Sequence, residues 1–496
     1  MYITDKIPSL SKRFKIDIYS PNIILSLLIV TGLILRLYRL DFRSLNFDEA
    51  NSIAFAKNSI TYILDKTPLS IGDLHPPFFH ILLHFHISVS ETEFWVRLIS
   101  AVLGVIIIYI TYLLGRYLFD LRTAMLGAFL VMLSPFFISY SQEARMYPLF
   151  TLLTISSIYF FIKAIDMESK RYYLWFTIFS ILNLYTHYIA FFILFAETIF
   201  FIINWKRYNN SKLFFLFSLI VIFLSFSPWI PTVLTQFTAG EGQLSKDIAP
   251  GTGLIIPYSL FVFSVGETFL QIKSLKDAVS NIPLIFLVAI IFLIPIVNST
   301  FKKKDNRLLF IILIPIIILY ILSWKIPRIL NSVKYIIALS PVYYLLISYG
   351  ITNMRRMSHQ VVFAILITFL NIASLWNYHY NEIYRSEDWR GVVKYVSAGL
   401  TGSDVIIFDA GHMQTLFDYY CKCDIKKIRL NPRLTDDREE AFKNIEKEIA
   451  PHKNIWLILS HNWKNGDYYK RLLDVHLTRS LDYKTKGIEI YKYVGA

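Results

Sequence analysis

Two adjacent carboxylates, Asp48 and Glu49, follow the first long apolar segment of the chain. A carboxylate at a membrane surface can accept the proton of an attacking hydroxyl group, so one of the two is a candidate general base. Adjacent helical residues point about 100° apart, so we expect only one of them to face a reaction site. A simpler interpretation is that Asn46 and Glu49 form a capping box at a helix start, where the helix dipole also favours acidic residues.

A histidine followed by two prolines lies in the same connection, within residues 73–77. Proline fits the first turn of a helix, so we expect His75 to be held at a helix start. There it either makes an ordinary loop hydrogen bond or contacts a metal ion or a phosphate group. His80 and His84 are four residues apart, but without an H-E-x-x-H pattern they are a weak zinc signal, and we interpret them as interfacial residues.

Cationic and aromatic residues recur in later connections of the chain. Arg145 either pairs with Glu143 or makes bidentate contacts with an anionic lipid phosphate. His187 lies in a further connection, and Arg328 and Lys334 lie in another. These connections alternate along the chain, so a membrane topology would bring acids, histidines and cations to one face.

The elements that must position these residues are membrane helices. The chain of 496 residues is 55% hydrophobic and 17% charged, whereas soluble domains carry about 25% charged residues. About 20 apolar residues suffice to cross a bilayer, and several runs reach that length. We predict a polytopic α-helical membrane protein with about eleven transmembrane helices, at residues 21–40, 94–118, 123–141, 147–165, 172–187, 188–204, 213–230, 283–299, 308–324, 333–352 and 360–378.

The loop charges predict the orientation in the cell (plasma) membrane. The net charge of +14 is concentrated in alternate short loops, which the bilayer explains better than a nucleic-acid partner does. The positive-inside rule places the N-terminus in the cytoplasm and the C-terminal region outside, with external loops at residues 41–93 and 231–282. The first apolar run lacks an A-x-A cleavage site, so we expect it to be retained. The apolar stretch 254–265 could cross the membrane, but we favour a helix in the interface because a crossing would turn the basic run 302–307 outward.

Residues 385–496 differ in composition from the preceding membrane region, 1–384. Alternating patterns predict strands at residues 405–408, 455–459 and 488–491, and the segment 435–449 predicts a charged helix. We therefore expect a small extracytoplasmic α/β domain. Cys421 and Cys423 could form a disulfide, remain free thiols or have no role, and we favour the last.

At these residues the chain resembles the GT-C glycosyltransferases, specifically the family 39-like branch related to protein O-mannosyltransferases and to the aminoarabinose transferases of lipid A. The similar motifs occur in order and cover the whole membrane region: Asp48-Glu49, D-x-H-P-P at 73–77, Q-E-A-R-x-Y at 142–147, T-H-Y at 186–188, Lys334-Tyr335 with a later Pro341, and Asp388-Trp389-Arg390.

The resemblance implies that a hexose or pentose is transferred from a polyprenyl-phosphate donor on the external face, with inversion at the anomeric carbon. It implies that Asp48 is the catalytic base and Glu49 its neighbour, and it assigns the donor phosphate to Arg145, Tyr147, Lys334 and Arg328. His75 and His187 would contact a metal ion or the phosphate, so a divalent metal ion is an open alternative. The acceptor could be a protein, a glycan or a lipid.

Two other classes of protein are compatible with the sequence. A flippase or transporter of lipid-linked sugars would move its substrate without chemistry, and is expected to bury ionisable groups and to contain repeats. We find no clear repeat, and Glu197 is the exception among acids that mostly lie in loops. The other class is a degenerate relative that binds a partner through its external domain, against which the retained Asp48, His75 and Arg145 argue.

Overall fold

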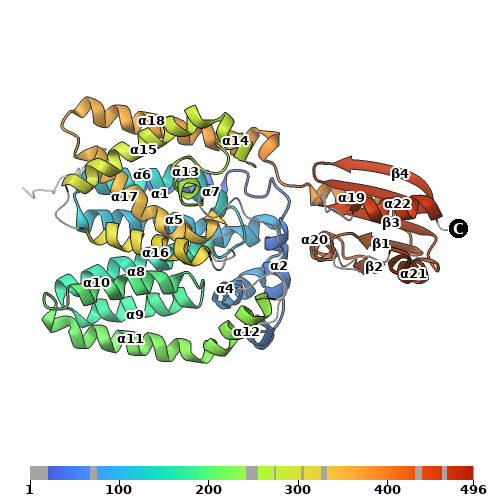
Figure 1. Cartoon of the computed structure of the whole chain (residues 1–496), viewed down its shortest axis with the longest axis horizontal. Helices are drawn as coiled ribbons and strands as arrows, with labels where there is room; N and C mark the ends of the chain where they lie inside the picture. Colours follow the sequence, from blue (N-terminus) through green and yellow to red (C-terminus); the bar gives the residue numbers. More distant parts are fainter. Residues whose placement is uncertain are drawn as a thin grey trace, which may run out of the picture.

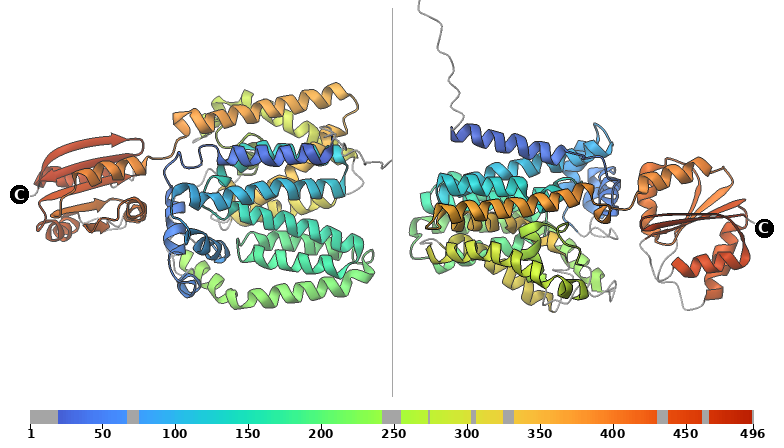
Figure 2. Two further views of the ribbon diagram at one scale, coloured as in Figure 1. Left: turned by 180° about the vertical axis from the view of Figure 1, so that it is seen from behind. Right: turned by 90° about the horizontal axis from the view of Figure 1, so that it is seen from above.

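The computed structural model describes residues 20–66, 75–241, 255–272, 275–302, 306–324, 332–429, 438–460 and 466–494. A bundle of apolar helices carries a separate small α/β domain at one end (Figure 1). The long helices run side by side in both further views (Figure 2). They are α1 (Pro21–Leu37), α5 (Glu93–Leu118), α6 (Leu121–Leu133), α7 (Pro135–Ser141), α8 (Tyr147–Met167), α9 (Lys170–Leu184), α10 (Ala190–Ile203), α11 (Lys212–Phe226), α15 (Ile282–Lys302), α16 (Arg307–Ser323), α17 (Ser340–Thr352) and α18 (Met357–Tyr380).

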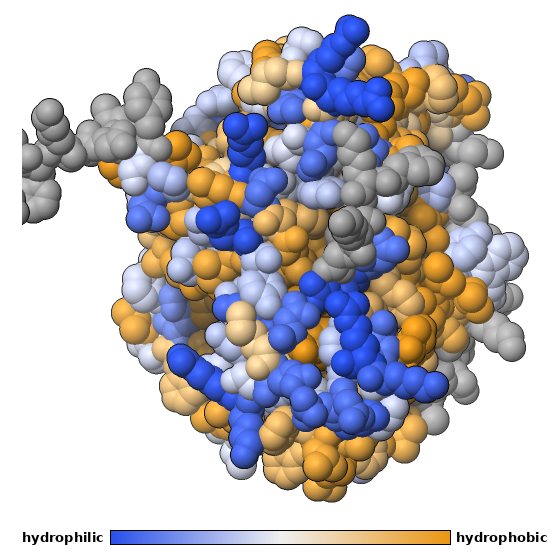
Figure 3. Space-filling view, turned by 90° about the vertical axis from the view of Figure 1, so that its left-hand side faces the viewer, coloured by the Kyte–Doolittle hydropathy of each residue, from blue (hydrophilic) through white to orange (hydrophobic). Residues whose placement is uncertain are grey.

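The bundle has the surface of a membrane protein. Hydrophilic side chains are spread over its end opposite the α/β domain, with hydrophobic side chains between and around them (Figure 3). Each of the eleven predicted spans coincides with a helix, one of them with the pair α6 and α7. In the described residues six helices are long and apolar enough to cross a membrane, or seven if the bent pair is one span. The polytopic fold is therefore confirmed, whereas eleven crossings remain a prediction.

The break between α6 and α7 bends the path by 55°. Pro135 has no backbone N–H, so the carbonyl of Val131 loses its usual helical partner. The buried Arg36 guanidinium supplies donors instead: Nη2 lies 3.3 Å from the Val131 carbonyl oxygen and Nη1 lies 3.3 Å from that of Met132. Because lipid offers no hydrogen bonds to backbone groups, this substitution makes the bend possible within the bundle.

Shorter helices cover the end of the bundle that faces the α/β domain. They are α2 (Phe47–Ala56), α3 (Ile60–Lys66), α4 (Phe78–Ile87), α12 (Ile230–Glu241), α13 (Ile255–Val265) and α14 (Leu275–Ser280). Helix α13 corresponds to the stretch predicted to lie in the interface. Its 11 residues are too few to cross a bilayer. Seven of them are buried, so α13 packs within the protein.

The C-terminal domain is a five-stranded mixed sheet in the order β2-β1-β3-β5-β4, flanked by helices. Strands β1, β2 and β3 are parallel, whereas β5 is antiparallel to both β3 and β4. The elements are β1 (Asp404–Phe408), β2 (Lys426–Arg429), β3 (Asn454–Ser460), β4 (Thr478–Thr485), β5 (Ile488–Val494), α19 (Trp389–Gly399), α20 (Gln414–Tyr420), α21 (Arg438–Ile449) and α22 (Gly466–His476). The three predicted strands and the charged helix are confirmed, and the predicted boundary at residue 385 lies between α18 and α19. Cys421 and Cys423 are joined by a disulfide directly after α20.

Helix α20 docks the C-terminal domain onto the segment that carries the candidate base. The Tyr420 hydroxyl accepts a hydrogen bond from the Leu45 backbone N–H at 2.7 Å and donates to Glu93. The His412 ring packs against the Phe47 ring at a centroid distance of 4.8 Å. The domain therefore contacts the start of α2 directly.

Candidate active site

The capping box at the start of α2 is present. The Asn46 side chain accepts a hydrogen bond from the Glu49 N–H at 2.9 Å, and Glu49 Oε2 accepts one from the Asn46 N–H at 3.1 Å. The helix begins at Phe47, directly after the capping residue Asn46. Asp48 and Glu49 therefore lie in the first turn of α2, and their side chains point to different faces of the helix. The simpler interpretation of Glu49 thus accounts for part of its position.

Glu49 is almost fully buried and is held by an arginine from α5. Arg97 donates from Nε to Glu49 Oε1 at 2.7 Å and from Nη2 to Oε2 at 2.8 Å. The Ala144 N–H also donates to Oε1 at 2.9 Å. With both oxygens accepting hydrogen bonds, Glu49 joins α2 to α5 and to the turn before α8. This geometry favours a positioning role for Glu49 over a catalytic one.

Asp48 is the carboxylate that remains accessible. Its side chain is 36% exposed, and Lys334 Nζ lies 3.1 Å from Oδ2. Lys334 comes from the 3₁₀ segment η6 (Val333–Leu339), which precedes α17. The buried Arg145 holds the backbone of the same turn, because its Nη1 donates to the Asp48 carbonyl oxygen at 3.1 Å and to Ser52 Oγ at 2.6 Å. Two segments distant in sequence thus hold Asp48, Lys334 at its carboxylate and Arg145 at its backbone.

Aromatic rings line the site beside this ion pair. The His75 and His187 rings lie 4.9 Å apart, and Tyr335 lies 5.7 Å from His187. Lys334 Nζ lies 5.6 Å above the ring of Tyr147. A cation over an aromatic face is stabilised by the ring quadrupole. The described members of the predicted site, Asp48, His75, Arg145, Tyr147, His187 and Lys334, are therefore brought together, and Arg328 lies outside the described residues.

Two further carboxyl groups near the site were not predicted as site residues. Burial, with a contribution from Glu49, raises the pKa of Glu143 to about 8, although nearby Lys334 acts to lower it. Burial likewise raises the pKa of Glu267, which accepts a hydrogen bond from Tyr140 at 3.4 Å. Glu143 had been considered only as a partner of Arg145. Within the described chain the Arg145 guanidinium instead contacts α2, and only the three-dimensional packing reveals this.

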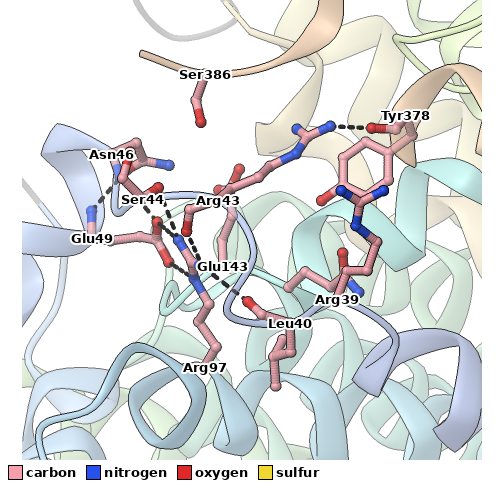
Figure 4. Close-up of a pocket in the computed structure, with 11 residues that line it drawn as sticks. Arg39, Leu40, Arg43, Ser44, Asn46, Glu49, Arg97, Glu143, Tyr378 and Ser386 are labelled. Carbon is pink, nitrogen blue, oxygen red and sulfur yellow. Dashed lines mark hydrogen bonds and ion pairs between the residues drawn. The ribbon is translucent and has the colours of Figure 1, made fainter. Parts of the chain in front are cut away.

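Cavities connect these groups to the C-terminal domain. A small cavity of about 50 Å³ lies next to the start of α2 (Figure 4). It is lined by the Glu49–Arg97 pair and by Glu143. Ser386, from the connection to the C-terminal domain, points into it. A larger cavity of about 420 Å³ has Asp48 in its wall. The candidate base is thus reachable from the side of the C-terminal domain.

The divalent metal ion that the sequence left as an open alternative has no three-ligand site among the described residues. No three His, Cys, Asp or Glu side chains among them converge on a point suitable for a metal ion. Asp48 is engaged with a cation, and the His75 and His187 rings contact each other. We therefore derive no chemical step through a metal ion.

Comparison with known proteins identifies the fold. The sequence model of a family described as dolichyl-phosphate-mannose-protein mannosyltransferase matches residues 74–231. A structure of ArnT from Cupriavidus metallidurans, bound to undecaprenyl phosphate, superposes with a TM-score of 0.61 at 10% identity, covering 94% of this chain and 97% of ArnT. The chain has a GT-C glycosyltransferase fold. No curated protein sequence matches it.

A second GT-C structure supports the same conclusion. The oligosaccharyltransferase of Archaeoglobus fulgidus, in complex with Zn and sulfate, gives a TM-score of 0.55 at 15% identity and covers 94% of this chain and 72% of its own. The same archaeal protein, AglB, was also solved with an inhibitory peptide and a dolichol-phosphate, with a TM-score of 0.53, 14% identity and coverage of 95% and 74%. The predicted resemblance and fold class are confirmed, and both the matched family and these neighbours are glycosyltransferases.

Proposed function

We propose that the chain transfers a sugar from a polyprenyl-phosphate donor to an acceptor hydroxyl, on the external face of the plasma membrane and with inversion. The observation that carries the proposal is the accessible Asp48 carboxylate, 3.1 Å from Lys334 Nζ, at one end of a bundle with a GT-C fold. The lipid phosphates bound by the structural neighbours support the class of donor.

In the proposed reaction Asp48 acts as the general base. It accepts the acceptor's hydroxyl proton while that oxygen forms a bond to the anomeric carbon of the sugar. The bond from the anomeric carbon to the phosphate oxygen breaks, and its electron pair leaves with the polyprenyl phosphate. A single displacement by an oxygen on the opposite face inverts the anomeric configuration. Cations aimed at the leaving phosphate stabilise its growing charge.

Lys334 is the cation best placed to couple donor binding to this step. Before the donor binds, the ammonium group is paired with Asp48. A donor phosphodiester offers the ammonium group a second anionic partner, and the polyprenyl phosphate that leaves gains a further negative charge, so the ammonium group would be drawn from Asp48 towards the phosphate. The Asp48 carboxylate would then be released to accept a proton. Arg145 fixes the Asp48 backbone while this exchange occurs.

The proposed orientation places Asp48 and the C-terminal domain outside the cytoplasm. The alternating loop charges support it. The disulfide between Cys421 and Cys423 also supports it, because disulfides persist in oxidising extracytoplasmic environments.

Sugar release from a panel of polyprenyl-phosphate sugars, by the purified chain in lipid, tests the proposal. We expect turnover by the wild type and a loss of about 10²–10⁴-fold in Asp48→Asn, the typical contribution of a general base. Asp65→Asn, an exposed aspartate on α3, is the matched control and should retain turnover. Equal turnover by wild type and Asp48→Asn would remove Asp48 from the mechanism. Movement of the donor across the bilayer without sugar release would favour the flippase alternative.

A further inference from the structure

The cavity that contains Asp48 has walls from two domains. Its volume is about 420 Å³, within the range of about 300–1,000 Å³ that is usual for small-molecule sites. The membrane region and the C-terminal domain line it with Leu45, Asn46, Phe47, Asp48, Ser386, Glu387, Trp389 and Leu416. An acceptor hydroxyl that reaches Asp48 from this cavity would therefore contact the C-terminal domain.

A second cavity adjoins the first and is rich in cations. Its volume is about 340 Å³, and it shares Ser386 and Glu387 with the first cavity. Four cationic side chains line it, namely Arg43, Arg385, Arg390 and Lys394, against the two carboxylates Glu387 and Asp388. Arg390 is paired with Glu93, and Arg43 donates to the Tyr378 carbonyl oxygen. The net positive charge of the lining therefore rests mainly on Arg385 and Lys394, and we name the four cationic residues the basic cleft.

The two carboxylates of this lining already have hydrogen-bond donors. Asp388 caps α19 by accepting a hydrogen bond from the Gly391 N–H at 2.9 Å. Glu387 Oε2 accepts one from Trp389 Nε1 at 2.9 Å. These bonds hold the two carboxylates in place at the edge of the cleft.

Two of the cations are available to a ligand. Arg385 is paired with Glu382 at 3.1 Å, but the Glu382 side chain is 81% exposed, and such surface pairs contribute little. The Arg385 side chain is itself 39% exposed. Lys394 is exposed and lies four residues after Arg390 on α19, so both project from the same helix face.

We infer that the acceptor is an anionic sugar. Its reacting hydroxyl lies at Asp48, and its phosphate or carboxylate group binds in the basic cleft; the inference rests on the proposed transferase function. Guanidinium groups bind either anion through charge-assisted hydrogen bonds. A peptide would be expected to use an extended groove or a free strand edge, whereas these two cavities are compact and adjacent.

Equilibrium binding to the full chain in lipid nanodiscs tests the inference. The probes are a glucuronate disaccharide, a phosphorylated disaccharide, the matched neutral disaccharide and an acidic peptide. We expect wild type to bind one or both anionic sugars about tenfold more tightly than the neutral one, with an advantage that falls at high salt. Arg385→Gln/Lys394→Gln should remove this advantage. Lys447→Gln, an exposed lysine on α21, should keep it.

The outcomes separate this inference from the proposed function. Equal binding of neutral and anionic sugars, an unchanged advantage in Arg385→Gln/Lys394→Gln, or equally tight binding of the acidic peptide would overturn the anionic-sugar acceptor. If the anionic advantage holds but sugar release does not depend on Asp48, the proposed mechanism fails while the basic cleft stands as a binding site.

Discussion

Glu49 and Arg97 form a buried ion pair between α2 and α5, with side chains 1% and 4% exposed. Removing one partner of such a pair leaves an uncompensated buried charge, which costs about 3–5 kcal/mol. We expect Glu49→Ala to lower the free energy of unfolding by that amount in detergent-solubilised protein. Glu91→Ala is the control, because the Lys57–Glu91 pair is 38% and 43% exposed and contributes about 0–1 kcal/mol. Equal losses in the two variants would contradict the structural role of Glu49.

The ionisation of Glu143 should make the rate of sugar transfer from the donor depend on pH. Burial raises its pKa to about 8, so the carboxyl group is largely protonated and neutral at pH 7 and ionises as the pH rises through 8. The new negative charge near Asp48, Glu49 and Lys334 should disfavour the anionic donor. We expect kcat/KM for the donor to fall above about pH 8, measured as initial rates across pH. Glu143→Gln should abolish that fall. An identical pH profile in the variant and the wild type would show that Glu143 does not cause it.

At this scale the order and topology of the motifs predicted which residues lie together, and the roles of these residues remain a proposal. Asp48, Arg145 and Lys334 were predicted from their chemistry, order and topology, and they converge. Glu49 could not be separated from Asp48, because its partner Arg97 lies 48 residues away. Glu267 was missed because its importance comes from burial beside Tyr140 and Lys334, which local sequence does not encode.

Arg36 donates hydrogen bonds to the two backbone carbonyls at the α6–α7 bend. In Arg36→Ala the carbonyls of Val131 and Met132 lose their guanidinium donors, and each buried unsatisfied group costs about 1–3 kcal/mol. We expect a lower midpoint of thermal unfolding for this variant. Arg116→Ala, at an exposed position near the end of α5, is the control. A midpoint lowered no more than in the control would mean that Arg36 does not support the bend.

Helix positions were predicted because hydropathy alone decides where a chain can cross lipid. The prediction of a single span over 123–141 nevertheless missed the bend, although Pro135 was a visible signal for it. The adjoining spans predicted at 172–187 and 188–204 are joined by a short connection, since α9 ends at Leu184 and α10 begins at Ala190. Strands β2 and β4 were not predicted. Most of their residues are exposed, so their sequences lack the alternation of hydrophobic and polar residues that indicates a strand.

Docking of the C-terminal domain depends on Tyr420. Tyr420→Phe removes the oxygen that bonds to the Leu45 N–H and Glu93, so we expect faster amide exchange at residues 45–56 and a lower rate of sugar transfer. Tyr395→Phe is the matched control, because the Tyr395 ring stacks on Tyr483 within the C-terminal domain. Unchanged exchange in Tyr420→Phe would show that the hydroxyl does not fix the loop.

The placement of the C-terminal domain could not be predicted. Periodicity and composition predict local elements, and they predicted a small α/β domain. The contacts that dock it join residues more than 300 positions apart, such as Tyr419 with the Glu91 carbonyl oxygen. No pattern within either segment indicates the other. Only the folded chain shows that the domain forms a wall of the cavity at Asp48.

The Leu45–Tyr420 contact also has a consequence for how the protein is made. The two residues are 375 positions apart, so at about 5–20 residues per second Tyr420 is synthesised about 20–75 s after Leu45. During that interval α2 is already made, but the cavity around Asp48 lacks Ser386, Trp389 and Leu416. The proposed acceptor site is therefore completed only after the C-terminal α/β domain has folded, so we expect the nascent chain to be inactive while its helices are still being inserted into the membrane.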